Sequence, residues 1–101
     1  MGKQIRQIKW DSFALNSFLN ILEFIKLDSP SNAKIIKNRI LNLVSDIPKN
    51  PEIYRIDELK KENDGSFRVL NKDSIRISYK IEDSAIIIAR IVHSSQMPKT
   101  Y

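Results

Sequence analysis

Two helical stretches joined by a very short link constrain the fold of this chain more than any other feature of its sequence. Apolar side chains recur every three or four positions across residues 13–27, and the same spacing returns across residues 33–47. The link Asp28-Ser29-Pro30 ends the first stretch, because proline disfavours the helical conformation of the residue before it. Two helices connected so closely should run back along each other, which predicts an αα-hairpin.

Most of the remaining chain alternates between apolar and polar residues, which is the pattern of half-buried strands. A first strand is expected to end at Trp10, and three more are expected over residues 67–70, 74–82 and 85–93. Residues 52–66 are polar and predict a connector that holds a short strand near its start. The order β-α-α-β-β-β favours a two-layer α+β domain, with the helical hairpin packed on one face of a mainly antiparallel sheet of four to five strands.

The composition excludes several classes of functional site. The sequence has 101 residues, 42% of them hydrophobic, which predicts a single domain over residues 1–101. It contains no cysteine and one histidine, His93, so neither a disulfide framework nor a transition-metal centre is expected, and no metal or cofactor is predicted. No apolar run approaches the roughly 20 residues that cross a bilayer. The expectation is therefore a cytoplasmic protein that does not use a membrane.

The charge of the chain favours an anionic partner. Lysine and arginine total 17 and the acids total 12, which gives a net charge of +5 at pH 7. RNA, DNA and an acidic protein segment all fit this description, and many small basic domains bind no nucleic acid. Acids are interspersed with the lysines in the stretch DELKKEND at residues 57–64. Charge alone therefore leaves the kind of partner open.

The register of the last two strands predicts which side chains share a face of the sheet. A turn at residues 83–84 would pair Tyr79 with Ile88 and Arg76 with Ile91. Isoleucines from both strands then join Tyr79 on one face. This mostly apolar face is the one that the helices are expected to cover.

The opposite, open face of the sheet combines cations with apolar side chains. It is predicted to carry Arg76, Ile87, Ala89, Ile91 and His93. Exposed apolar side chains in a row favour a partner that covers them. The same register places the cation of Arg90 among the covered isoleucines, which indicates that the register or the strand boundary is irregular there.

The order of elements and the C-terminal half resemble the RelE/ParE superfamily of bacterial type II toxins. The likeness rests on an opening strand that ends in Trp10, the Ser29-Pro30 link, the IPKNP stop after the second helix, the strand IRISYKIED, and the closing segment IARIVHSSQMP. It implies the RelE-like fold and the toxin half of a toxin–antitoxin pair, a class associated with plasmid stabilization. It also implies a cognate antitoxin with an acidic, partly disordered segment. Toxin and antitoxin are expected to form a hetero-oligomer in which this segment binds the open face at Ile87, Ala89 and Ile91 or the exposed sides of the two helices.

Members of this superfamily have one of two activities, cutting mRNA on the ribosome or poisoning DNA gyrase. The first hypothesis from the resemblance is a ribosome-dependent, metal-independent mRNA endoribonuclease that inhibits translation. In this chemistry the 2′-hydroxyl attacks the adjacent phosphate, and the protein supplies proton transfer and cations at the phosphate. The gyrase poison is the alternative, and a catalytically degenerate binding module is the third hypothesis.

The resemblance assigns catalytic roles to four residues. Arg76 matches the arginine that contacts the scissile phosphate, and Arg68 matches a phosphate clamp or proton-transfer aid on the preceding strand. His93 matches the general acid or base of YoeB-like members. Tyr101 matches the tyrosine that contacts the substrate in RelE-like members.

Further positions bear on the choice of target. Lys60 and Lys61, in the polar connector, are expected to contact mRNA or ribosomal RNA. Ser95 stands where RelE-like members place a basic residue, and Ser94 replaces the aromatic residue of YoeB-like members. A histidine at the position of His93 also occurs in ParE-like toxins, so that residue fits both activities.

Overall fold

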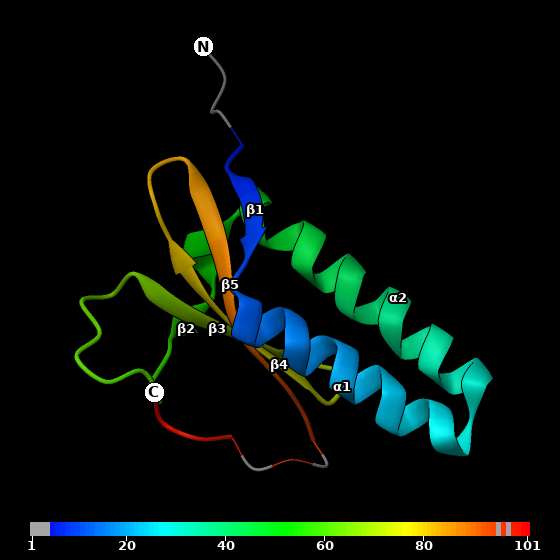
Figure 1. Cartoon of the computed structure of the whole chain (residues 1–101). Coiled ribbons are helices and arrows are strands. Elements are labelled where there is room, and N and C mark those ends of the chain that lie inside the picture. The colour runs from blue at the N-terminus through cyan, green and yellow to red at the C-terminus, as the bar shows by residue number, and fades with distance from the viewer. Residues whose placement is uncertain (1–4, 95, 97) are drawn as a thin grey trace.

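The chain folds into two layers, a pair of helices and a five-stranded sheet (Figure 1). This computed structural model describes residues 5–94, 96 and 98–101. In chain order the elements are β1 (Gln7–Trp10), α1 (Ser12–Asp28), α2 (Pro30–Asp46), the 3-10 turns Ile47–Lys49 and Pro51–Ile53, β2 (Arg55–Ile56), β3 (Phe67–Lys72), β4 (Ile75–Ile81) and β5 (Ala85–His93). The predicted α+β class and the order of its elements are confirmed.

Ser29 joins the two helices of the hairpin by capping both of them. Its backbone N–H donates to the carbonyl of Ile25 at the end of α1, and its hydroxyl accepts from the N–H of Asn32 at the start of α2. Pro30 follows at the beginning of α2, where a missing N–H leaves no hydrogen bond unmade. These caps explain why so short a link reverses the chain. Neither described helix is long and apolar enough to cross a membrane.

The strands lie in the order β1-β5-β4-β3-β2. β1 runs parallel to β5, because the chain leaves β1 through the helical hairpin before it returns to the sheet. The other neighbouring strands are antiparallel, so the sheet is mainly antiparallel, as predicted. α1 packs against β5, which places the first helix beside the last strand of the sheet.

The hydrophobic core lies between the hairpin and the covered face of the sheet. Its helical side chains are Ala14, Phe18, Ile21, Ile36, Ile40, Leu43 and Val44, and its sheet side chains are Leu70, Ile75, Ile77, Tyr79, Ile86, Ile88 and Ile91. The hydroxyl of Tyr79 is buried in this core, and it donates a hydrogen bond to the carbonyl of Pro51 at 2.6 Å. The helical and strand periodicities therefore identify most of the buried face of each layer.

A β-bulge in β5 corrects the predicted register. Ile88 has its predicted partner on β4, but the pairing then shifts by one residue, so Ala89 is an extra residue in β5. Arg76 consequently pairs with Val92, and the predicted pairing of Arg76 with Ile91 is wrong. In the apolar–polar pattern of the sequence, the only sign of this bulge is Arg90, a charged residue that the pattern places on the apolar face.

The bulge exchanges the two faces for the last part of β5. Ile91 turns into the core, where it is 2% exposed, so its predicted position on the open face is wrong. His93 pairs with Ile75 and shares the helix-covered face, so its predicted position on the open face is also wrong. Arg90 pairs with Ser78 and joins the open face, which accounts for its irregular place in the sequence pattern.

Candidate functional site on the open face of the sheet

Asp57 is the centre of a buried polar cluster on the open face. It follows β2 at the start of the connector and is 1% exposed. Its carboxylate accepts hydrogen bonds from Arg76 Nη2 at 2.8 Å, from the Tyr101 hydroxyl at 2.6 Å, and from the backbone N–H of Leu59 at 3.0 Å. One carboxylate therefore joins the connector, β4 and the C-terminal segment.

The guanidinium of Arg76 is neutralised inside the protein. Arg76 is 9% exposed, and its Nη2 contacts Asp57 at 2.8 Å and Glu58 at 3.0 Å. Its Nη1 donates to the hydroxyl of Ser78 on the same strand at 2.9 Å. Arg55 pairs with the other oxygen of Glu58 at 2.6 Å, so two arginines balance two carboxylates in this cluster. A buried arginine is tolerated here because its charge is balanced and both of its terminal nitrogens donate hydrogen bonds.

Hydrogen bonding sets the protonation states of the cluster. Burial alone would raise the pKa of Asp57, but hydrogen bonds from Tyr101, Arg76 and other donors outweigh burial and hold that pKa below its ordinary value of 3.8. Burial, followed by the hydrogen bond to Asp57, raises the pKa of Tyr101 well above its ordinary value. At neutral pH Asp57 is therefore ionised and Tyr101 carries its proton, as their contact requires.

The lowered pKa of Asp57 predicts a specific loss of stability in acid. A carboxylate of this kind contributes stability above its unfolded pKa, near 3.8, and the contribution is lost as the pH falls through the still lower folded value. The Asp57→Asn variant should be less stable than the parent protein at neutral pH, and the difference should shrink below about pH 4. Urea unfolding of both proteins, from neutral pH to below about pH 4, measures this difference in stability. A difference that stays constant in acid would contradict the ionised hydrogen-bonded carboxylate.

Tyr101 straps the C-terminal segment across the connector. Its backbone N–H donates to the carbonyl of Leu59 at 2.9 Å, and its carbonyl accepts from the N–H of Lys61 at 2.6 Å. Its ring meets the Phe67 ring edge-on, with the centroids 6.0 Å apart, and the ammonium of Lys60 lies 4.8 Å from the centre of the Phe67 ring. Both lysines that were predicted to contact RNA therefore flank Tyr101.

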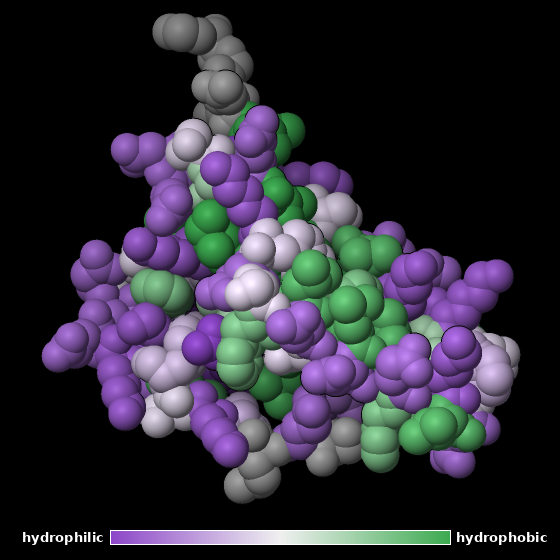
Figure 2. Space-filling model, in the orientation of Figure 1, coloured by the Kyte–Doolittle hydropathy of each residue, from purple (hydrophilic) through white to green (hydrophobic). Residues whose placement is uncertain are grey.

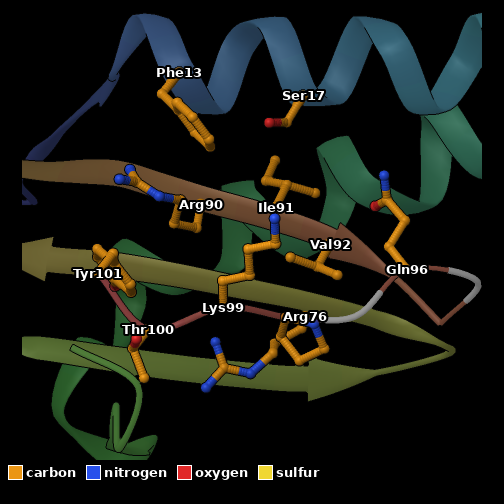
Figure 3. A pocket seen from close by; sticks show the side chains of 11 residues that line it. Phe13, Ser17, Arg76, Arg90, Ile91, Val92, Gln96, Lys99, Thr100 and Tyr101 are labelled. Carbon is orange, nitrogen blue, oxygen red and sulfur yellow. The ribbon is translucent and has the colours of Figure 1, made fainter.

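A pocket of about 330 Å³ lies beside this cluster, between α1, β5 and the C-terminal segment (Figure 3). Arg90 lies between the rings of Phe13 and Tyr101, whose centroids are 4.1 and 4.5 Å from its Cζ. The side chain of Lys99 points toward α1 from the opposite wall (Figure 3). The pocket therefore presents cations beside aromatic and apolar walls. In the part of the chain that the structure describes, no group of three or more potential metal ligands occurs.

Arg68 holds the backbone that precedes β2. It shares the helix-covered side of the sheet with its partner Tyr79. Its Nη1 donates to the carbonyls of Glu52 and Tyr54 at 3.0 Å each, and its Nε donates to the carbonyl of Gly65 at 3.0 Å. These hydrogen bonds hold the segment before β2 and the end of the connector against β3. Arg68 therefore has a structural role in this fold.

The four residues of the ribonuclease hypothesis form two groups in the structure. Asp57 brings Arg76 and Tyr101 together on the open face. Arg68 and His93 belong to the covered face and lie near the beginning of β3 and at the end of β5. His93 lines a small pocket with residues of α1. Arg76 and His93 nevertheless line one pocket at the end of β5, and the catalytic roles of all four residues stay predictions.

The three apolar residues that were predicted to bind the antitoxin occupy different environments. Ile87 is half-buried and pairs with Lys80 on the open face. Ala89 is the extra residue of the bulge and is 5% exposed, while Ile91 belongs to the core. Ile87 therefore offers most of the accessible apolar surface among the three. Ser95, the position of the missing tail cation, lies outside the described residues.

Sequence reasoning missed two residues of this site, Asp57 and Arg90. Asp57 has no local signal, because its partners Arg76 and Tyr101 lie 19 and 44 residues away along the chain. Arg90 did have a signal, since its charge on a face of isoleucines pointed to an irregular strand. The β-bulge at Ala89 is the cause of this irregularity. It turns Arg90 to the open face, where its side chain lines the pocket.

The helical hairpin, the mixed sheet and its open face define this chain as a toxin of the RelE/ParE superfamily, from a type II toxin–antitoxin system. A family model described as the ParE toxin of the type II toxin–antitoxin system, parDE, matches residues 8–98. The chain belongs to this ParE toxin family.

Two solved structures share the fold. A structure of the chromosomal ParDE toxin–antitoxin system from P. aeruginosa matches with a TM-score of 0.71 and 17% sequence identity, over 88% of this chain and 96% of that chain. The YoeB dimer from Staphylococcus aureus matches with a TM-score of 0.56 and 19% identity, over 86% of this chain and 94% of that chain. Comparison with curated proteins gave no match. The predicted RelE-like fold is confirmed.

Proposed function

We propose that this ParE-family toxin acts by binding and poisoning DNA gyrase, and that it does not cut mRNA. The observation that carries the proposal is the internal neutralisation of Arg76 by Asp57 and Glu58. An arginine that stabilises a phosphate in a transition state must direct free donors at that phosphate. A phosphate that took the place of Asp57 at Nη2 would have to separate a desolvated ion pair, which is costly.

The position of His93 supports the same proposal. A general acid or base must come within hydrogen-bonding reach of the group that it protonates or deprotonates. His93 lies on the helix-covered face of the sheet, whereas Arg76 lies on the open face. The imidazole and the guanidinium therefore start from opposite faces of the sheet, although both residues line a shared pocket of about 300 Å³ at the end of β5.

The mRNA endoribonuclease is the second candidate, and the cations of the open face favour it. Arg90 and Lys99 line the pocket together with Tyr101. The ammonium of Lys60 lies over the rings of Phe67 and Tyr101. Together with the net charge of +5, these cations could hold a phosphate backbone. This candidate requires the ribosome or the mRNA to release Arg76 from Asp57.

As the toxin of a type II system, the protein has a cognate antitoxin as its partner. Two kinds of surface suit such a partner: the open face near Ile87, and an apolar surface on the helices. Figure 2 shows apolar side chains gathered over α1 among polar neighbours. The exposed large apolar residues of α1 and α2 are Phe13, Leu15, Leu19, Phe24, Leu27, Ile35 and Leu41. An amphipathic antitoxin helix could cover this surface, since apolar helix faces commonly bind in apolar grooves.

Expression of the toxin in bacteria without its antitoxin tests the gyrase proposal. Growth should stop, a DNA-damage reporter should be induced, and gyrase should be recovered covalently trapped on DNA, while mapped mRNA 5′ ends stay as in the control. The His93→Gln variant should arrest growth as strongly as the parent protein, because no proton transfer is involved. Breaks inside reading frames without trapped gyrase would favour the ribonuclease instead.

A further inference from the structure

Arg90 and Lys99 are cations without acidic partners, in contrast to Arg76. The two arginines of the neighbouring cluster, Arg55 and Arg76, are balanced by Asp57 and Glu58. Among the described residues, neither Arg90 nor Lys99 forms an ion pair. Arg90 and Lys99 both line the pocket of about 330 Å³, and no carboxylate of the described side chains balances their positive charges there.

The environment of Arg90 leaves one edge of its guanidinium available. The rings of Phe13 and Tyr101 lie 4.1 and 4.5 Å from Cζ, on either side of the group (Figure 3). Nη1 donates to the carbonyl of Ala89 at 2.7 Å, while Nε and Nη2 donate to no described residue. A guanidinium held between rings binds a ligand through its in-plane N–H groups, and the Nε and Nη2 pair matches the two oxygens of one carboxylate.

The rest of the pocket suits the end of a side chain. Ser17 of α1 adds a hydroxyl, and Lys99 adds an ammonium that points toward α1 (Figure 3). Val92 and Pro98 give the walls an apolar character that an aliphatic stem can pack against. A volume of about 330 Å³ is near the lower limit of ligand pockets, enough for one or two side chains.

We propose that this pocket binds a glutamate or aspartate side chain from an acidic segment of the cognate antitoxin, with Arg90 and Lys99 as its cationic ligands. The proposal rests on the assignment of the chain as a type II toxin, and not on gyrase as the target. A single nucleic-acid strand fits less well. Such strands bind along a row of cations with exposed rings for base stacking, whereas the Tyr101 ring is already in contact with Arg90 and Phe67.

Fluorescence anisotropy with the full-length toxin tests this site. The probe is a labelled decapeptide of alternating glutamate and leucine, compared with the same peptide carrying glutamine in place of glutamate. The acidic peptide should bind, and Arg90→Gln should weaken it by about tenfold, because a charge-assisted contact is lost. Lys99→Gln, an exposed substitution that the fold should tolerate, should weaken binding several-fold. The glutamine peptide should not bind measurably.

Lys34→Gln is the matched control, since it removes one exposed cation from α2. It should leave the affinity of the acidic peptide unchanged. Equal weakening by Lys34→Gln and Lys99→Gln would overturn the proposal in favour of diffuse attraction to a basic surface. A uridylate decamer that binds more tightly than the acidic peptide, and loses that affinity in Arg90→Gln, would also overturn it and identify a nucleic-acid site. No gyrase is present, so failure here is distinct from failure of the gyrase proposal.

Discussion

Replacing Asp57 with alanine is expected to lower the free energy of unfolding by about 3–5 kcal/mol, because Arg76 stays buried without its inner partner. The exposed Glu58 is the remaining acid beside Arg76, and its side chain is 51% exposed, so it compensates poorly. The substitution also removes the acceptor of the Tyr101 hydroxyl and releases the strap across the connector. For a domain whose whole stability is about 5–15 kcal/mol, this is a large fraction.

Urea unfolding of a double-mutant cycle measures this effect. Arg76→Met alone should also be strongly destabilising, but the Asp57→Ala/Arg76→Met double variant should cost less than the sum of the two, because each change removes the partner that the other leaves unpaired. Glu23→Ala is the control, since it removes one exposed carboxylate and should change stability by no more than about 0.5 kcal/mol. An Asp57→Ala variant as stable as the Glu23→Ala control would refute the buried ion pair.

Ile40→Asp is expected to prevent folding altogether. Ile40 is 0% exposed in the core between the hairpin and the sheet. The substitution removes apolar contacts worth about 2–5 kcal/mol and places a carboxylate where no donor can pair with it. Circular dichroism should show an unfolded chain at temperatures where the parent protein is folded.

Ile35→Asp provides the control for this substitution. Ile35 lies on the same helix, is 54% exposed, and undergoes the same chemical change. It should therefore keep the circular dichroism spectrum and cooperative melting of the parent protein. A folded Ile40→Asp variant, or an unfolded Ile35→Asp variant, would contradict the assignment of the two faces of α2.

The fold was predictable from the sequence because its main signals are local. The spacing of Ile36, Ile40 and Leu43 marks the buried side of α2, and Ser29-Pro30 marks the turn of the hairpin. The pairing at Ile88 follows from the two-residue turn that precedes β5. The bulge at Ala89 was not predictable from alternation alone, because an inserted residue exchanges the faces without changing the residue types.

The candidate site was less predictable because its contacts are long-range. Arg76 and Tyr101 could be proposed from the resemblance, but the residue that joins them is Asp57, in a connector that reads as solvated. Burial of this acid depends on the strap formed by Tyr101, which no local pattern encodes. Arg90 was visible as an exception to the pattern, and the structure supplies its physical reason.

The most direct test of gyrase as the target uses purified components. The toxin is incubated with gyrase, ATP and supercoiled plasmid, and in parallel with translating ribosomes and a defined mRNA. We expect linear plasmid covalently bound to gyrase after denaturation, with the mRNA intact on the ribosome, since Arg76 is held by Asp57 and Glu58. Cleavage of the ribosome-bound mRNA, together with normal supercoiling and no trapped gyrase, would contradict the proposal and establish the ribonuclease.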